Sequence, residues 1–235
     1  MITDFHTHLL PNVDDGSHTL SESITMLQME AKQGIQRLIA TPHFYAHHDN
    51  PEQFLSRRQA AYRQLVSEME KHDGLPKLLL GAEVYFFPGI SESEILHKLT
   101  IGETHTILIE MPMAHWTDGM YRELEGIRSK QGLIPVVAHI DRYIAPFATH
   151  GIPGKLAQLP VLVQANAEFF IKKSTRALAM KLLKADHIHL LGSDAHNMQS
   201  RTPNLGEAIR IIRNKLGEYP LERIREYEQD FLQPI

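Results

Sequence analysis

Seven short runs of apolar residues alternate along the chain with segments of helical character. Such runs suit strands that are buried on both faces of a parallel sheet. A strand, a helix and a second strand in that order imply a right-handed crossover. Seven such units favour an α/β barrel over an open, doubly wound sheet. The runs lie at residues 2–7, 36–41, 78–85, 105–110, 134–139, 161–166 and 188–193.

Helix boundaries are expected where capping residues precede apolar periodicity and where glycine follows it. The stretch 144–160 holds Pro146, Pro153 and Pro160, and we expect it to be the one long irregular connection. The expected helix starts are Thr19 with Glu22, Asn50 with Pro51, Ser91 with Glu94, Asp118, Ser174 and Asn204, and the expected stops are Gly34, Gly74, Gly132 and Gly217.

The chain length and the net charge restrict the classes of protein to which this chain can belong. The 235 residues, 43% of them hydrophobic, can bury a substantial core, and we expect a single domain over residues 1–235. The net charge of −4 provides no basic excess for tracking extended nucleic acid. The chain has no long apolar run and no basic, apolar leader, so we expect a cytoplasmic protein without membrane insertion.

The residue counts also restrict the chemistry. There is no cysteine, which excludes disulfides, thiolate metal ligands and a thiolate nucleophile. There are 15 histidines, and this abundance favours metal ligation or acid–base work for some of them.

Ligand-type residues stand at the ends of six of the seven expected strands. In parallel α/β folds the carboxyl ends of the strands carry the functional groups. Residues two apart on a strand project to the same face, so His6 and His8 can hold one ion together, and Asp194 and His196 repeat that spacing. Glu83 could bridge two ions. The residues concerned are His6, His8, His43, Glu83, Glu110, His139, Asp194 and His196.

This set exceeds the needs of one tetrahedral site, so we expect more than one ion. Imidazole and carboxylate without thiolate suit Mn, Zn or Fe. The pattern therefore predicts a metal-dependent protein.

A structural role competes with ligation at each position. A single histidine beside apolar residues is commonly an ordinary core or surface residue. Glu110 could instead form an ion pair with a buried arginine. We expect the ordinary role for His18, His47, His48, His72, His97, His105, His115, His150, His187 and His189, which lie away from strand ends or on solvated segments.

Five segments spread over residues 4–196 resemble the PHP (polymerase and histidinol phosphatase) superfamily. They are similar above all to the CpsB/YwqE type of bacterial protein-tyrosine phosphatase from capsule and exopolysaccharide operons. The segments are Asp4-Phe5-His6-Thr7-His8-Leu9-Leu10-Pro11 with Asp14-Asp15-Gly16, Ala40-Thr41-Pro42-His43-Phe44, Gly81-Ala82-Glu83-Val84-Tyr85, Ala138-His139-Ile140-Asp141-Arg142-Tyr143 and Gly192-Ser193-Asp194-Ala195-His196.

The resemblance implies a distorted (β/α)7 TIM-like barrel with two or three divalent ions, Mn above all, with Zn, Fe or Mg as alternatives. Asp14 stands where many relatives have histidine, and the usual His-Pro-Glu-Arg-Tyr motif is here residues 139–143, His-Ile-Asp-Arg-Tyr. By motif position, the first ion would be held by His6, His8, Glu83 and Asp194, the second by Glu83, Glu110 and His139, and the third by Asp14, His43 and His196.

Phosphate ester hydrolysis needs a nucleophile at neutral pH and stabilisation of the phosphoryl oxygens. Clustered divalent ions supply a hydroxide, and we expect Arg142 and Arg201 to hold the phosphoryl group, unless they are ordinary rim charges. The resemblance further implies phosphotyrosine as substrate and the tail of a bacterial tyrosine kinase as partner. Aromatic walls for the aryl group, or else core residues, are expected at Phe44, Tyr45, Phe86, Phe87, Trp116 and Tyr143.

Three alternatives remain open at this point. One is a small-molecule phosphatase of the histidinol-phosphate type with the same metals. Another is a metal-dependent amidohydrolase, which usually bridges its ions through a carboxylated lysine rather than through a residue such as Glu83. The last is a catalytically silent metal-binding scaffold. The sequence leaves open whether Asp15 or Asn166 contributes to the site.

Overall fold

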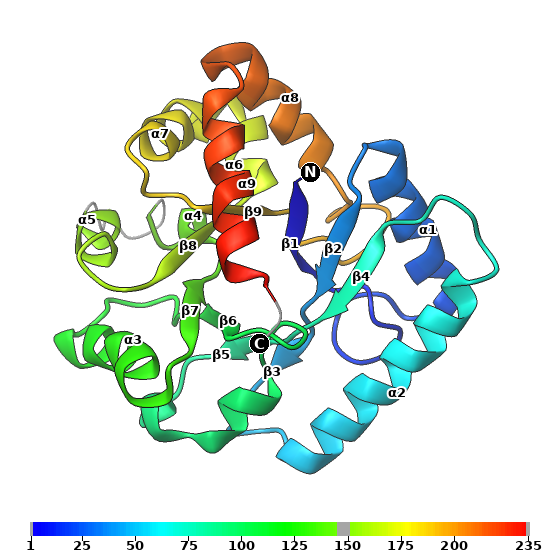
Figure 1. Cartoon of the computed structure of the whole chain (residues 1–235), viewed down its shortest axis with the longest axis horizontal. Coiled ribbons are helices and arrows are strands. Elements are labelled where there is room, and N and C mark those ends of the chain that lie inside the picture. The colour runs from blue at the N-terminus through cyan, green and yellow to red at the C-terminus, as the bar shows by residue number, and fades with distance from the viewer. Residues whose placement is uncertain (1, 145–150, 234–235) are drawn as a thin grey trace.

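A computed structural model describes residues 2–144 and 151–233 of the chain (Figure 1). All seven apolar runs form strands, because each buries β-branched and leucine side chains on both faces. The third run is broken into two strands, and a further short strand follows the second run. The strands are β1 (Thr3–Thr7), β2 (Arg37–Ala40), β3 (His43–Phe44), β4 (Lys77–Leu80), β5 (Glu83–Tyr85), β6 (Thr106–Glu110), β7 (Ile134–Val137), β8 (Leu162–Asn166) and β9 (Leu190–Gly192).

The strands form two parallel sheets, in the orders β1-β2-β4 and β3-β5-β6-β7-β8-β9. The chain runs on directly from β2 to β3 and from β4 to β5, which joins the sheets on one side. On the other side β1 meets β9 through a bridge between Thr7 and Ala195. There the His8 N–H donates to the Ala195 carbonyl and the Asp194 N–H to the His6 carbonyl, both at 2.8 Å. We call this contact the β1–β9 seam. The sheets thus curl around one interior, and the predicted distorted (β/α)7 barrel is confirmed.

Helices surround the strands (Figure 1). No helix in the described ranges is long and apolar enough to cross a membrane. Asn50 caps its helix as predicted by accepting from the Gln53 N–H at 3.1 Å, and Thr19 does the same for Glu22 at 3.2 Å. The helices are α1 (Leu20–Lys32), α2 (Pro51–Met69), α3 (Asp118–Gln131), α4 (Ile140–Ile144), α5 (Ile152–Leu156), α6 (Ala167–Ile171), α7 (Lys173–Lys184), α8 (Leu205–Leu216) and α9 (Tyr219–Phe231).

Several predicted boundaries were wrong by a few residues. Thr117 rather than Asp118 precedes α3, Lys172 rather than Ser174 precedes α7, and α2 ends at Met69, before Gly74. The segment expected to start at Ser91 forms two 3₁₀ turns, η1 (Ile90–Glu92) and η2 (Glu94–Lys98).

The connection over residues 144–160 was predicted to be irregular, yet it includes α5. Pro153 lies in the first turn of α5, where a missing N–H costs no hydrogen bond. Pro146 and His150 lie outside the described residues.

The barrel interior is filled below the predicted site by apolar side chains from strands all around it, including Phe5, Ile39, Leu108, Val136 and Leu190. Leu232, after α9, packs into the same cluster. Helix α9, which crosses in front of the strands in Figure 1, therefore closes the end of the barrel where the strands begin.

A buried polar contact fixes α9 in this place. The Glu228 side chain accepts from the Thr3 N–H at 2.7 Å and lies 3.4 Å from the Arg37 guanidinium.

Candidate metal centre

Eight of the nine predicted ligand residues converge at the carboxyl ends of the strands, as the parallel topology requires. They come from β1 and the residue after it, from β3, β5 and β6, and from the loops after β7 and β9. All of them are buried except His43, which is half-buried. Their ligand atoms form three overlapping groups, which are described in turn.

The first group unites residues that lie far apart in the sequence. His6 Nε2 lies 2.9 Å from His8 Nε2 and 3.0 Å from Glu83 Oε2. Asp194 Oδ1 lies 3.6 Å from each of the two Nε2 atoms. Ligand atoms about 2.1 Å from a tetrahedral ion lie about 3.4 Å apart, so the four atoms have the spacing of one ion site.

The second group lies on the other oxygen of Glu83. His139 Nε2 is 2.8 Å from Glu83 Oε1 and 3.5 Å from Glu110 Oε1. Glu83 thus faces the first group with Oε2 and the second with Oε1, which is the arrangement of a bridging carboxylate.

The third group differs from the prediction. His43 Nε2 and His196 Nε2 lie 3.5 Å and 3.4 Å from Asp15 Oδ1. Asp14, which was expected here, instead accepts from His8 Nδ1 at 2.7 Å and from the His43 backbone N–H at 3.0 Å. Asp14 therefore orients the His8 ring by its contact with Nδ1, whereas Asp15 lies beside the His43 and His196 rings. The sequence shows two adjacent aspartates at this position. It does not define the loop conformation, so it could not predict which aspartate contacts which histidines.

Burial and close charges shift the pKa values of this cluster in opposite directions. Burial alone would lower the pKa of His8, but the Asp14 and Glu83 carboxylates raise it to about 10. Burial would likewise lower the pKa of His139, and Glu110 and Glu83 raise it to about 9. Burial would raise the pKa of Glu83, yet the surrounding imidazoles hold it well below its usual range. The site therefore keeps its carboxylates charged.

The donor set fits divalent ions. His196 Nε2 is buried and makes no hydrogen bond within the described part of the chain, although a carboxylate oxygen of Asp15 lies 3.4 Å away. Buried nitrogens normally find a partner, so lone pairs that face carboxylates without sharing a proton favour ligation. No thiolate is present, and oxygen with imidazole nitrogen is the set that Mn, Zn and Fe accept.

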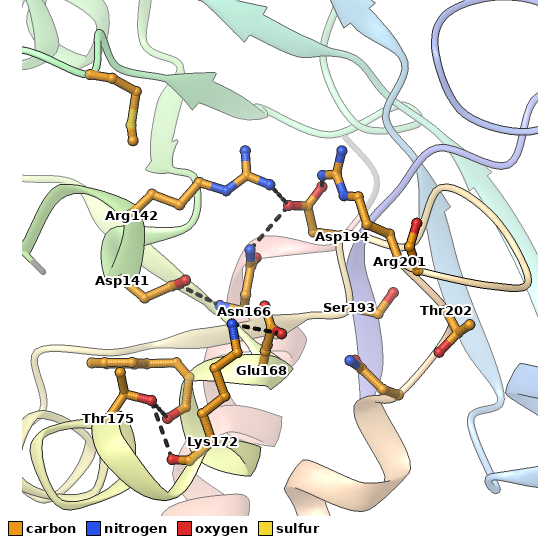
Figure 2. A pocket seen from close by; sticks show the side chains of 14 residues that line it. Asp141, Arg142, Asn166, Glu168, Lys172, Thr175, Ser193, Asp194, Arg201 and Thr202 are labelled. Atoms are coloured by element: carbon orange, nitrogen blue, oxygen red, sulfur yellow. Dashed lines mark hydrogen bonds and ion pairs between the residues drawn. The ribbon is translucent and has the colours of Figure 1, made fainter. Parts of the chain in front are cut away.

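The two predicted arginines lie on either side of Asp194, a member of the first group (Figure 2). Arg201 Nη2 donates to Asp194 Oδ1 at 2.7 Å, and Arg142 Nη2 donates to Asp194 Oδ2. Both side chains remain about one third exposed, at 32% and 35%, so several of their N–H groups face solvent.

Beside these arginines opens a cleft of about 470 Å³, lined further by Asn166, Lys172 and Thr202. Asn166 donates to Asp194 Oδ2 at 3.0 Å and so belongs to the site; sequence reasoning had left its role open.

The aromatic residues divide into core and rim. Phe44, Phe86, Trp116 and Tyr143 are buried and belong to the core, and Phe87 is half-buried. Tyr45 is half-buried beside His43, with ring centroids 5.2 Å apart, and Tyr85 lies 5.6 Å from Tyr45. Tyr85 was not predicted as part of this wall, because its neighbours on β5 read as core.

The histidines expected to be ordinary lie outside the three groups wherever the structure describes them. His47 and His48 are exposed beside Tyr45, whereas His189 accepts from the Val163 N–H at 2.9 Å.

Comparison with known proteins shows the family to which the chain belongs. A model of the capsular polysaccharide synthesis family CpsB/CapC matches residues 2–230. The tyrosine-protein phosphatase YwqE of Bacillus subtilis is 30% identical over 227 residues, which cover 91% of this chain and 85% of YwqE. The tyrosine-protein phosphatase CpsB of Streptococcus agalactiae is 28% identical over 226 residues, which cover 92% of this chain and 91% of CpsB.

Solved structures agree. One from the crystallographic work on Bacillus subtilis YwqE and Streptococcus pneumoniae CpsB, described there as metal-dependent tyrosine phosphatases, matches with a TM-score of 0.86 at 26% identity. The match covers 100% of this chain and 96% of the other. A putative histidinol phosphatase from Listeria monocytogenes, at 11% identity and a TM-score of 0.51 over 84% of this chain and 96% of its own, shares the fold alone. The chain belongs to the CpsB/CapC family of capsular polysaccharide synthesis proteins.

Proposed function

We propose that this protein is a metal-dependent tyrosine-protein phosphatase that acts in capsule or exopolysaccharide synthesis. The observation that carries the proposal is the convergence of three His/Asp/Glu groups, one of which shares Asp194 with a cleft lined by two partly exposed arginines. The relatives named tyrosine-protein phosphatases support the same activity.

The three groups would hold two or three ions, with Mn as the first choice. His6, His8, Glu83 and Asp194 would hold the first, Glu83 with Glu110 and His139 the second, and Asp15 with His43 and His196 the third. Bound divalent ions would supply a hydroxide at neutral pH and neutralise phosphoryl charge.

The residues around the ions bind and orient the substrate. A guanidinium has five N–H donors, so Arg142 and Arg201 can each keep the bond to Asp194 and still donate to a phosphoryl oxygen from the cleft side. Fixed cations at that point stabilise the charge on the equatorial oxygens during transfer. Asp194 therefore aligns the phosphate-binding groups with the metal-binding groups.

Two features support phosphotyrosine as the substrate: the tyrosine rings beside the metal centre and the family to which the chain belongs. The Tyr45 ring lies next to His43 and the Tyr85 ring next to Tyr45, and both can pack against the ring of a phosphotyrosine. The partner in this proposal is the tail of a bacterial tyrosine kinase, in the cytoplasm, a choice that fits a family of capsular polysaccharide synthesis proteins.

Hydrolysis of a phosphotyrosine peptide with added Mn²⁺, with and without chelator, tests the activity. We expect turnover that the chelator abolishes and Mn²⁺ restores, and we expect Glu83→Ala to be inactive because both ion sites that share it are lost. Full turnover by metal-depleted Glu83→Ala would refute the metal mechanism. No turnover of any phosphomonoester with metal present would favour a silent scaffold.

A matched pair of substrates separates protein phosphatase from small-molecule phosphatase. We expect Tyr45→Ala to raise KM for a phosphotyrosine peptide by about 2- to 10-fold, since aromatic pairs contribute about 0.5–1.5 kcal/mol. The same variant should leave KM for histidinol phosphate or phosphoserine peptides nearly unchanged. Faster wild-type hydrolysis of histidinol phosphate than of phosphotyrosine would instead favour the small-molecule phosphatase.

A further inference from the structure

Gln164 lies on β8 and is fully buried in the barrel below the metal-facing residues. A buried primary amide has two N–H donors and an oxygen acceptor to satisfy. Its Oε1 accepts from the backbone N–H of His139 at 2.7 Å and faces His6 Nδ1 at 3.4 Å, and its Nε2 donates to Asn166 Oδ1 at 3.0 Å. One side chain therefore touches two of the proposed ligand residues and the asparagine beside a third.

The backbone contact fixes which way the Gln164 amide points. A backbone N–H can only donate, so the atom 2.7 Å from His139 N must be the amide oxygen. That same oxygen is an acceptor 3.4 Å from His6 Nδ1, so it favours the His6 tautomer with the proton on Nδ1. The lone pair of His6 then lies on Nε2, the atom that faces His8, Glu83 and Asp194 in the first group.

Asn166 continues the chain of hydrogen bonds in the same sense. Its Oδ1 is occupied as an acceptor by Gln164, so its Nδ2 is the donor to Asp194 Oδ2 at 3.0 Å (Figure 2). The other oxygen of Asp194, Oδ1, lies 3.6 Å from His6 Nε2. The hydrogen bonds thus run from His6 through Gln164 and Asn166 to Asp194, and both ends of this series face one ion position.

Two of the residues in these contacts, His139 and Asp194, have unusual backbone torsion angles. His139 has φ 30° and Asp194 has φ 55°, a region that residues other than glycine rarely adopt. Such conformations persist only where the surroundings impose them. Gly192 permits the close packing involved, because a Cβ there would lie 2.9 Å from Gln164 Nε2 and 2.7 Å from His6 Cβ.

We propose that Gln164 and Asn166 are positioning residues for the metal centre. Gln164 sets the tautomer of His6 and holds the strained backbone of His139, and Asn166 turns the Asp194 carboxylate toward the ion position. Partners of this kind behind a metal ligand typically change metal affinity by about 10- to 100-fold when removed. The inference rests on the proposed metal-dependent function.

The test measures metal binding without any substrate. Mn²⁺ affinity is determined by competition with a chelating dye, and the visible absorption spectrum of the Co²⁺-loaded protein reports the coordination geometry. We expect Gln164→Leu to weaken Mn²⁺ binding by about 10- to 100-fold and to alter the Co²⁺ spectrum, because His6 loses its acceptor. Asn166→Ala should act in the same direction through Asp194.

Two further variants keep the test decisive. Gln164→Glu keeps an oxygen for His139 and His6 but loses the donor to Asn166. We therefore expect its Mn²⁺ affinity to fall between those of the wild type and Gln164→Leu. This variant also tests the proposal if Gln164→Leu does not fold. Gln33→Leu removes an amide that bonds Pro203 and Gly206 instead, and it should leave affinity and spectrum unchanged.

Wild-type affinity and an unchanged Co²⁺ spectrum in the folded Gln164 variants would overturn the positioning role. A wild-type protein that binds Mn²⁺ tightly but hydrolyses no phosphomonoester would overturn the proposed function and leave the positioning role standing.

Discussion

At the scale of single residues, Asp194 joins the two halves of the site. Its Oδ1 faces the imidazoles of His6 and His8 and accepts from Arg201. Its Oδ2 accepts from Arg142 and Asn166. Burial would raise the pKa of this carboxyl, but His6 and Arg142 lower it, so it stays charged. In the proposed function, one carboxylate would thereby set the distance between the ions and the phosphate-binding cations.

Substituting the arginines by lysine tests their part in phosphate binding. Lysine keeps the charge but loses the planar fork, so we expect Arg142→Lys and Arg201→Lys each to lower kcat/KM for p-nitrophenyl phosphate by about 10- to 100-fold, since hydrogen bonds to charged groups contribute about 1.5–3 kcal/mol. Metal content should stay at the wild-type level.

Arg213→Lys on α8 is the matched control, because Arg213 pairs with Glu218 away from the cleft. An unchanged kcat/KM in both cleft variants would contradict the assignment.

The two neighbouring aspartates should separate by metal content. Asp15→Asn removes a carboxylate from the third group, and we expect fewer ions per chain by elemental analysis. Asp14→Asn keeps an oxygen that can accept from His8 Nδ1, so we expect an unchanged number of ions with weaker binding. The reverse pattern would restore Asp14 as the ligand.

The residue types at the strand ends could be predicted because the strands are parallel and their carboxyl ends must meet. The choice between Asp14 and Asp15 could not, since both lie in a loop whose backbone the sequence does not define. Gln164 was not predicted as a site residue for another reason. A single amide within an apolar run does not indicate a function, and the contacts of Gln164 are with His6 and His139, which lie far away in the sequence.

At the scale of elements, buried strands were predictable, whereas helices with weak signals were not. Helix α9 was missed because its apolar positions are interspersed with charged residues, and its packing depends on the barrel end that it covers. The break between β4 and β5 was also missed, because Gly81-Ala82 interrupts an apolar run without a polar residue to mark it.

Glu228 on α9 makes the attachment of this helix depend on pH. Burial raises its pKa from 4.5 to about 7. The folded state therefore favours the protonated form, so the contribution of Glu228 to stability is fully present below pH 4.5 and is lost as the pH rises to about 7. The shift corresponds to on the order of 3 kcal/mol.

Glu228→Gln should remove this dependence, because the neutral amide can replace the protonated acid beside Thr3. We expect the variant to gain stability over wild type at pH 8 and to match it at pH 4.5, measured by urea unfolding. A variant less stable than wild type at pH 8 would show that the charged pair with Arg37 dominates instead.

At the scale of the whole molecule, the β1–β9 seam has few backbone hydrogen bonds of its own, but the first ligand group spans it. His6 and His8 lie on one side of the seam and Asp194 on the other. A bound ion would therefore link the two edges, and ligands that bind only the folded state stabilise it.

Removing metal should loosen this seam first. We expect chelation to lower the melting temperature and to speed hydrogen exchange at the His8 and Asp194 amides, which bond across the seam. The amides of β6 and β7, in the middle of the larger sheet, should change little. Equal acceleration in both regions would mean that the ions stabilise the barrel as a whole.

The same placement has a consequence for biosynthesis. The ribosome delivers His6 and His8 long before Asp194 and His196, which lie far along the chain. At about 5–20 residues per second, the first imidazoles are synthesised roughly ten seconds or more before their acidic counterparts. A nascent chain that has not yet reached Asp194 is thus unable to assemble the first group.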